Sequence, residues 1–284
     1  MKHIVIAALL ALAASTAQAV GPEPVWKTEG FANPESVVYS SLQKVLYVSN
    51  VNGAPDAKDG NGFISQVGLD GKVIQRQWLK GLNAPKGLGY LRGYLYVADI
   101  DELLEIDTGN KRITRRFKAP GAKFLNDVTV TPRGTVFVSD TVTNTIWRLQ
   151  GEGFTAWLND AALENPNGLA FDQGKLIVAT WGAMKPDWST ETPGYLKAVD
   201  AETKTITARF APIPLGNLDG LVADGRGGYV VTDHTRGNVF KIGPDGQPNL
   251  WLQLTPGTAD IGAAPGLIVL PQMSENTLTA YPNK

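Results

Sequence analysis

Two carboxylates and two carboxamides occupy matching places in this chain, each directly before a run of strand-forming residues. They are Glu35, Asn126, Asn167 and Asp219. As a set they offer oxygen donors and two negative charges, which suits Ca²⁺, with waters or substrate oxygens completing about six to eight ligands. Mg²⁺ fits less well because it prefers a tighter octahedron, although the residues do not exclude another divalent cation. The residues therefore predict a hard-cation site, provided that the fold brings them together.

The elements that must position these residues recur along the chain at a nearly regular interval. Six short segments carry a polar residue at the mouth of a turn that opens onto a strand, at spacings of 51, 40, 41, 52 and 41 residues. The polar residues are, in order, Glu35, Lys86, Asn126, Asn167, Asp219 and Asp260. A repeat of about 40 residues built from short strands is typical of a β-propeller. The sequence therefore predicts an all-β, six-bladed β-propeller, with this ring of polar residues at one end of its central channel.

Each blade is expected to contain four strands. The third copy of the repeat shows them most clearly, at 128–130, 136–138, 145–149 and 154–158. The last copy ends after 277–281, one strand short. The segment 25–28, ahead of the first repeat, can supply the missing outer strand of the last blade, which would close the ring and remove its unpaired edges. We therefore expect a single propeller domain over residues 20–284.

The first nineteen residues have the features of a secretory signal peptide. A short basic start is followed by an apolar run over 4–14 and by Ala17-Gln18-Ala19, which fits a small-x-small cleavage site. We expect cleavage after Ala19 and a periplasmic or secreted protein, whereas a buried N-terminal strand is the alternative. The apolar run is too short to span a bilayer, and no membrane span is expected after cleavage.

The composition argues against several classes of partner. The 26 basic and 27 acidic residues are dispersed, so there is neither the basic face of a nucleic-acid-binding protein nor a polybasic membrane patch. The chain also lacks a glycine-rich phosphate-binding loop. A small-molecule substrate is therefore the expected partner, and the sequence leaves the oligomeric state open.

Two of the repeats are longer than the others, and their extra residues fall at equivalent places. The insertions are 50–62 and 181–194, each between the second and third strands of its blade. In a four-stranded blade that junction opens on the same face as the polar ring, so both loops are expected to shape a pocket there. Neutral variation of the surface is the alternative. Trp181 and Trp188 in the second insertion, with Met184, would line an apolar wall for the substrate, or they would only anchor the loop.

Lys86 and His234 offer further chemistry at this face. Lys86 is either a binding group for an anionic substrate or the partner of Asp260 in an ion pair, which would limit its repulsion of a cation. His234 follows a strand of the blade that carries Asp219, and it is a candidate general base, whereas a lone loop histidine is more often a polar surface group. Zinc is not expected, because the chain has no cysteine and no histidine besides His3 and His234.

Four of the motifs together resemble those of a known family. They are PES at 34–36, LND at 125–127, NPNGL at 165–169 and LDGL at 218–221. They resemble the motifs of the gluconolactonase, senescence-marker-protein and luciferin-regenerating-enzyme family, whose calcium propellers are related in fold to diisopropylfluorophosphatase and paraoxonase. The likeness runs in order over essentially the whole chain after the leader, and the combination of these short motifs carries it.

The resemblance implies roles for individual residues. Glu35, Asn167 and Asp219 would be metal ligands, and Asn126 would contact the metal or the bound substrate. Members of the family hydrolyse lactones, esters or phosphotriesters, and many have lost or changed this activity.

These observations predict an exported Ca²⁺-dependent hydrolase of a lactone or ester. The metal would polarise the carbonyl group and stabilise the negative charge that forms on its oxygen. Asp219 is the first choice for the group that takes a proton from water or attacks directly, with His234 as the other catalytic candidate. The alternative is a non-catalytic propeller that binds a small ligand or a protein partner at the same face, since this fold serves many functions.

Overall fold

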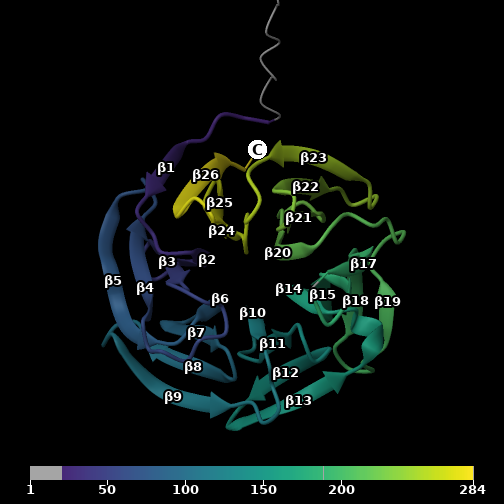
Figure 1. The fold of residues 1–284 in the computed structure, drawn as a ribbon, viewed down its shortest axis with the longest axis horizontal. Coiled ribbons are helices and arrows are strands. Elements are labelled where there is room, and N and C mark those ends of the chain that lie inside the picture. The colour runs from purple at the N-terminus through teal and green to yellow at the C-terminus, as the bar shows by residue number, and fades with distance from the viewer. Residues whose placement is uncertain (1–20, 188, 284) are drawn as a thin grey trace, which may run out of the picture.

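The structure, a computed structural model, describes residues 21–187 and 189–283 as a ring of six four-stranded antiparallel sheets around a common axis (Figure 1). This confirms the predicted all-β, six-bladed propeller. The predicted signal peptide (1–19) and Trp188 lie outside the described residues. Among the residues that are described, no helix has the length and apolar character needed to cross a membrane.

The strands of each blade follow one another from the axis outward. Blades 1 to 3 contain β2 (Pro34–Ser40), β3 (Val45–Asn50), β4 (Gly62–Gly68) and β5 (Val73–Leu82); β6 (Pro85–Leu91), β7 (Tyr94–Asp99), β8 (Glu102–Asp107) and β9 (Arg112–Lys118); and β10 (Leu125–Val130), β11 (Val136–Asp140), β12 (Thr145–Gln150) and β13 (Gly153–Asn159). Blades 4 and 5 contain β14 (Pro166–Asp172), β15 (Lys175–Thr180), β18 (Leu196–Asp200) and β19 (Ile206–Ala208); and β20 (Leu218–Ala223), β21 (Tyr229–Asp233), β22 (Asn238–Ile242) and β23 (Pro248–Gln253). A 3₁₀ turn, η1 (Ala161–Leu163), precedes blade 4, and a separate hairpin of β16 (Gly182–Met184) and β17 (Thr190–Pro193) rises from it.

Blade 6 combines both ends of the described chain. Its strands are β24 (Gly262–Ala264), β25 (Leu267–Gln272), β26 (Thr277–Pro282) and, outermost, β1 (Trp26–Glu29). Trp26 lies opposite Ala280 in the antiparallel pair of β1 and β26. The N-terminal strand therefore completes the last sheet, and this pairing joins the first and last blades into a ring.

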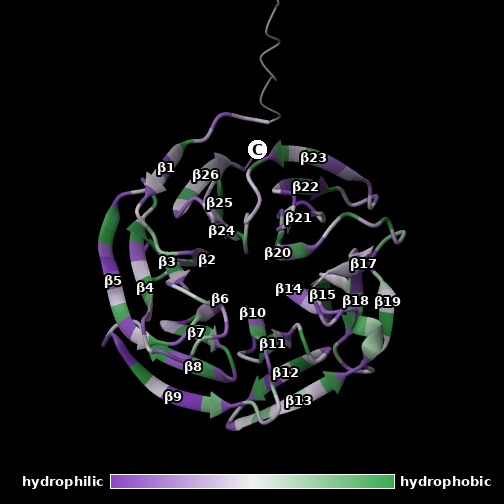
Figure 2. Ribbon diagram, in the orientation of Figure 1, coloured by the Kyte–Doolittle hydropathy of each residue, from purple (hydrophilic) through white to green (hydrophobic). Residues whose placement is uncertain are grey.

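The hydrophobic core is divided among the interfaces between blades. One cluster joins Tyr47 and Trp78 of blade 1 to Leu88 and Leu104 of blade 2, and similar clusters fill the other interfaces. The second strands are buried along their length, as in β3. The outermost strands, such as β9, instead alternate exposed and half-buried residues, and Figure 2 shows hydrophilic and hydrophobic residues mixed along them. The core therefore holds the blades, and with them the axial strands, in a fixed relation.

Each innermost strand of the first five blades has a bulge at its start. The strand register shifts after its first residue, namely after Pro34, Pro85, Leu125, Pro166 and Leu218. The second residue of each strand, which is the predicted ring residue, lies inside this bulge. Since a bulge changes the direction of the side chains within it, the repeated irregularity gives the ring residues a common setting at one end of the axis.

Gly168 follows a ring residue at a point where the innermost strands of blades 4 and 5 are very close. A Cβ atom there would overlap the carbonyl oxygen of Asp219. We therefore expect Gly168→Ala to lower the free energy of unfolding in urea by about 1–3 kcal/mol, as overpacking of a fixed interior does. Gly153→Ala on β13 is the control, because the nearest atom to its Cβ would be an oxygen of Gln150 at 3.7 Å. Equal losses of stability in the two variants would contradict the expected close approach.

Candidate active site

A cavity of about 250 Å³ opens at the end of the axis where the ring residues lie. Its lining contains the four predicted oxygen donors, Lys86, Trp181 and His234, together with Val51, Pro55, Phe124, Thr141, Met184 and Met273. The donors are buried, since Glu35 is 5%, Asn126 6%, Asn167 1% and Asp219 5% exposed. The structure thus brings together every predicted site residue that it describes, from five different blades and from positions 35 to 234 of the sequence.

The ring of six predicted residues requires one correction, in blade 6. Thr258 pairs with Gln272 at the end of β25, as Leu218 pairs with Asp233 at the end of β21. The residue that corresponds to Asp219 is therefore Ala259, and the expectation that Asp260 belongs to the ring is wrong by one position. Asp260 lies in the next layer along the axis, at the level that Asp127 occupies in blade 3.

Two of the ring oxygens lack a hydrogen-bond partner in the part of the chain that the structure describes. Glu35 Oε2 and Asn167 Oδ1 are buried, and neither has a hydrogen-bond partner among the described residues. Asn126 donates from its amide nitrogen to Thr141 Oγ1 at 3.3 Å, which leaves its oxygen for another group. A buried oxygen without a partner costs about 1–3 kcal/mol. Oxygens of this kind that line one cavity fit a bound hard cation, and their number and type suit Ca²⁺.

The charge around Glu35 supports the same interpretation. Burial raises the pKa of Glu35 well above its ordinary value, and the negative charges of Asp219 and Asp260 raise it further, whereas Lys86 acts in the opposite direction. The ring therefore holds more negative charge than its surroundings stabilise. A cation bound between the carboxylates would lower the pKa of Glu35 and restore its charge.

The amides are essential to this candidate site. In the part of the chain that the structure describes, no three acidic or histidine side chains come together as a metal-binding group. The ring has two carboxylates, Glu35 and Asp219. The oxygens of Asn126 and Asn167 therefore have to complete any cation site here.

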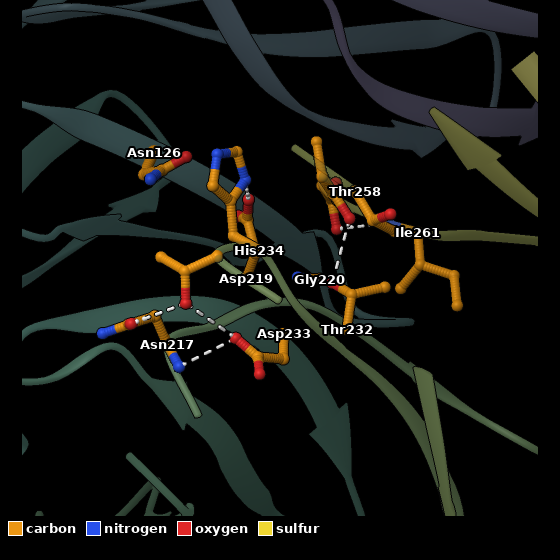
Figure 3. A network of polar contacts seen from close by, with 12 residues as sticks. Asn126, Asn217, Asp219, Gly220, Thr232, Asp233, His234, Thr258 and Ile261 are labelled. Atoms are coloured by element: carbon orange, nitrogen blue, oxygen red, sulfur yellow. Dashed lines mark hydrogen bonds and ion pairs between the residues drawn. The ribbon is translucent and has the colours of Figure 1, made fainter. Parts of the chain in front are cut away.

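Asp219 and His234 form a close pair beside the ring (Figure 3). His234 Nδ1 lies 2.8 Å from Asp219 Oδ2, and the imidazole lies 5.7 Å, between ring centroids, from Trp181. Burial lowers the pKa of His234, but the hydrogen bond and the charge of Asp219 outweigh it, so the pKa is raised overall. This pair can hold a proton near the ring, and it leaves the second carboxylate oxygen of Asp219 for another contact.

Lys86 is fully buried and held by backbone oxygens. Its Nζ donates to Pro55 O at 2.6 Å and to Ala84 O at 3.1 Å, and it lies 4.3 Å from the centre of the Phe124 ring. Burial lowers its pKa to about 8, although the charge of Glu35 opposes this.

Asp260, which was the suggested ion-pair partner of Lys86, makes other contacts. It accepts from Ser36 Oγ at 2.5 Å and from the amide of Ile261 at 2.7 Å. The ion pair of Lys86 with Asp260 is therefore wrong, and Lys86 remains a candidate substrate-binding group.

The two insertions form the rim of the cavity, as their positions predicted. Val51 and Pro55 come from the first insertion, and Trp181 and Met184 come from the second. The amide nitrogen of Met184 donates to Asn165 Oδ1 at 3.0 Å, which fixes the β16–β17 hairpin to its blade. The Nε1 atom of Trp181 is buried without a partner among the described residues. Trp188, the other predicted wall residue, lies outside the described residues, so its role stays a prediction.

A second set of residues, not predicted to be functional, holds the loops that carry the ring. Asp99 accepts from the amides of Asn83 and Ala84, directly before the strand of Lys86. Asp140 and Asp233 bind the corresponding loops of blades 3 and 5. The aspartates end the runs YVAD, FVSD and VVTD, so their recurrence is a signal that the sequence contained.

The burial of Asp127 and Asp260 is expected to make the stability of the protein without bound metal depend on pH. Burial raises the pKa of Asp127 to about 7, and burial together with Asp127 raises the pKa of Asp260 well above its ordinary value. Because the pKa of each carboxyl group is higher in the folded protein, its protonated form favours folding. This stabilisation is complete below the pKa of the unfolded chain, about 3.9, and is lost as the pH rises through the pKa of the folded protein. We therefore expect the calcium-free protein to become less stable between about pH 4 and pH 8.

Asp260→Asn tests this expectation. The asparagine can still accept from Ile261 and can donate to Ser36 Oγ, while it carries no charge. We expect it to raise the free energy of unfolding at pH 8 by about 1–3 kcal/mol and to change it little at pH 4, in urea titrations with a chelator. A variant that loses stability equally at both pH values would show that the hydrogen bonds, and not the charge, dominate at this position.

Comparison with solved structures places the fold among known propellers. A gluconolactonase from Xanthomonas campestris matches with a TM-score of 0.69 at 16% identity, over 91% of this chain and 88% of that one. A suspected gluconolactonase solved by a structural genomics consortium matches with a TM-score of 0.64 at 17% identity, over 93% and 94%. A chain of a nidogen–laminin complex matches with a TM-score of 0.65 at 15% identity, over 79% and 89%. No family model and no curated protein matches the sequence. At these identities the likeness shows a shared propeller fold, in agreement with the predicted architecture.

Proposed function

We propose that this protein is a calcium-dependent hydrolase of a lactone or ester, which acts at the axial cavity. The proposal rests on one observation, which is that candidate cation ligands and a candidate proton-transfer pair line the same cavity. The unpartnered oxygens of Glu35 and Asn167 lie in the same cavity as the Asp219–His234 pair. The names of two structural neighbours as gluconolactonases favour a lactone among such substrates.

In this proposal Glu35, Asn126, Asn167 and Asp219 hold the cation. When bound, Ca²⁺ supplies a positive charge that polarises the substrate carbonyl. The four residues are buried and fixed by the bulged strands, so they keep their positions while the charge on the carbonyl oxygen grows.

The Asp219–His234 pair moves the proton. A water molecule attacks the carbonyl carbon, the bond from that carbon to the ring or ester oxygen breaks, and a proton of the water passes through the pair to the leaving oxygen. The 2.8 Å contact between His234 Nδ1 and Asp219 Oδ2 supports this role, because it orients the imidazole beside the ring.

The test begins with the mature protein, freed of metal by a chelator. Calorimetric titration should show calcium binding with one major site, and hydrolysis of a panel of lactones and aryl esters should depend on that calcium. Magnesium serves as the control and should bind more weakly. Absence of calcium binding would contradict the metal site. Calcium binding without turnover on any substrate would favour the alternative, a propeller that binds a small ligand or a protein without chemistry.

The leader suggests where the enzyme works. We propose that residues 1–19 are removed on export, so that the protein acts in the periplasm or outside the cell. Fractionation of expressing cells, followed by N-terminal sequencing, should give a mature chain that starts at Val20. Full-length protein in the cytoplasm would contradict the proposal.

A further inference from the structure

We infer that the natural substrate is a small cyclic ester with an apolar body, not a polyhydroxylated sugar lactone. This inference rests on the proposed function, and it concerns which substrate the cavity accepts. Its basis is the distribution of polar atoms in the cavity, its size and the side chains at its rim.

The residues that the loops contribute to the cavity are mostly apolar, whereas the ring residues come from the starts of the innermost strands. The wall is formed by Val51, Pro55, Phe124, Trp181, Met184 and Met273. These residues come from both insertions, from the loop before β10 and from the loop after β25. A substrate bound with its ester group at the ring would therefore place the rest of its body against thioethers, aromatic rings and aliphatic carbons.

Most of the polar groups near the ring already have partners. Lys86 Nζ donates two of its three hydrogens to backbone carbonyls, the amide nitrogen of Asn126 donates to Thr141, and His234 Nδ1 contacts Asp219. The free oxygens of Glu35 and Asn167 are needed for the cation. The remaining hydroxyl groups of a sugar lactone would thus be buried without adequate partners, which strongly disfavours binding.

The size and adaptability of the cavity limit the range of possible substrates further. Its volume of about 250 Å³ lies below the range of about 300–1,000 Å³ that is usual for drug-sized ligands. It fits one lactone ring with a short alkyl chain or a fused aromatic ring. Met184 and Met273 are flexible and polarisable, so they can adapt to different chains, and Trp181 contributes an aromatic ring to the same wall. Substrates are then distinguished by apolar bulk instead of by hydroxyl pattern.

The first experiment measures hydrolysis by the calcium-loaded mature protein. A series of δ-lactones with alkyl chains from methyl to octyl is compared with glucono-δ-lactone. We expect kcat/KM to rise about fourfold per methylene, in line with the transfer of a CH₂ group from water, and to fall once the chain exceeds the cavity. Glucono-δ-lactone should be turned over at least about a hundredfold more slowly than the best alkyl lactone. Equal or faster turnover of glucono-δ-lactone would overturn the inference while leaving the proposed function intact.

The second experiment measures binding without chemistry. Alkyl δ-lactams have the same shape and resist hydrolysis, so their affinity by calorimetry reports the apolar wall alone. We expect affinity to rise with chain length. If it does so while no lactone is hydrolysed, the proposed function fails and only the preference of the cavity for apolar ligands is retained. Affinity that is independent of chain length, or absent for every lactam, would overturn the inference.

Met184 provides the matched variants. The hydrogen bond that holds Met184 to Asn165 is made by its backbone amide, so Met184→Gln and Met184→Leu should both keep the hairpin in place. We expect Met184→Gln to weaken the binding of hexyl δ-lactam about tenfold and Met184→Leu to change it less than about twofold. Equal effects of the two variants would show that the wall does not select for apolar chains.

Discussion

Replacing Asp219 by asparagine is expected to lower kcat/KM for lactone hydrolysis by about a thousandfold or more. Asparagine keeps the shape of the side chain but removes one of the two carboxylates of the ring. It also removes the charge that orients and stabilises the imidazole of His234, whose Nδ1 lies 2.8 Å from Asp219 Oδ2. Loss of a group that acts on both the cation and the proton is expected to cost this much or more.

A second readout separates this role from a structural one. The pKa of His234 is raised by its hydrogen bond with Asp219 and by the charge of that carboxylate, against the lowering effect of burial. It should therefore fall in Asp219→Asn. His3 lies in the predicted leader, so NMR of the mature protein should follow His234 alone.

Asp245→Asn is the control for this variant. Asp245 is exposed in the turn between β22 and β23 of the same blade, where it accepts from the amide of Gln247 at 3.1 Å. This change should leave activity and the His234 titration as they are. An Asp219→Asn protein that keeps a tenth of the activity, with an unshifted His234, would remove Asp219 from the proposed mechanism.

Replacing Glu35 by glutamine is expected to weaken calcium binding by about a hundredfold or more. The buried Oε2 atom of Glu35 has no hydrogen-bond partner among the described residues, and the substitution leaves one carboxylate, Asp219, to balance the charge of the cation. In the unaltered protein, calcium at a hundred times its Kd should add about 2.7 kcal/mol to the free energy of unfolding. That gain should fall to about 0.4 kcal/mol or less in Glu35→Gln at the same calcium concentration.

The metal-free form of this variant gives a further check. Glu35 is repelled by Asp219 and Asp260 and is penalised by burial, so Glu35→Gln should be at least as stable as the original protein when a chelator is present. Glu29→Gln, an exposed change on β1, is the matched control and should alter neither calcium binding nor stability. Calcium affinity in Glu35→Gln equal to that of the control would show that the cation, if bound, lies elsewhere.

The sequence predicted the repeat well because the repeat is local. The turn, the polar residue and the following strand recur within a few residues, and β-formers of the right spacing follow. Blade 6 was misaligned by one residue because Asp260 is polar and stands near the right place. Its register is fixed by the pairing of Thr258 with Gln272, and the pattern of residues within one strand does not show which residue lies opposite it in the next.

Some contacts of the site residues follow from strand pairing, and others depend on loops whose conformation the sequence does not show. The meeting of Asp219 with His234 follows from strand pairing, since Leu218 lies opposite Asp233 and each residue of the pair comes directly after one of these. Lys86 could not be placed in this way, because its Nζ is held by Pro55 from a long insertion of another blade. Loop conformations depend on the sum of many weak contacts, and the type of one residue does not fix them.

The pairing of β1 with β26 has a consequence for the order in which the protein is made and folded. Trp26 lies opposite Ala280, so the sheet that they share is incomplete until the chain has been synthesised as far as β26. The earlier blades can fold before that point, but β1 stays unpaired in the growing chain because its partner β26 has not yet been made. Until β26 has been made, the blades form an open array, and closing the ring requires a pairing between segments that are far apart in the sequence.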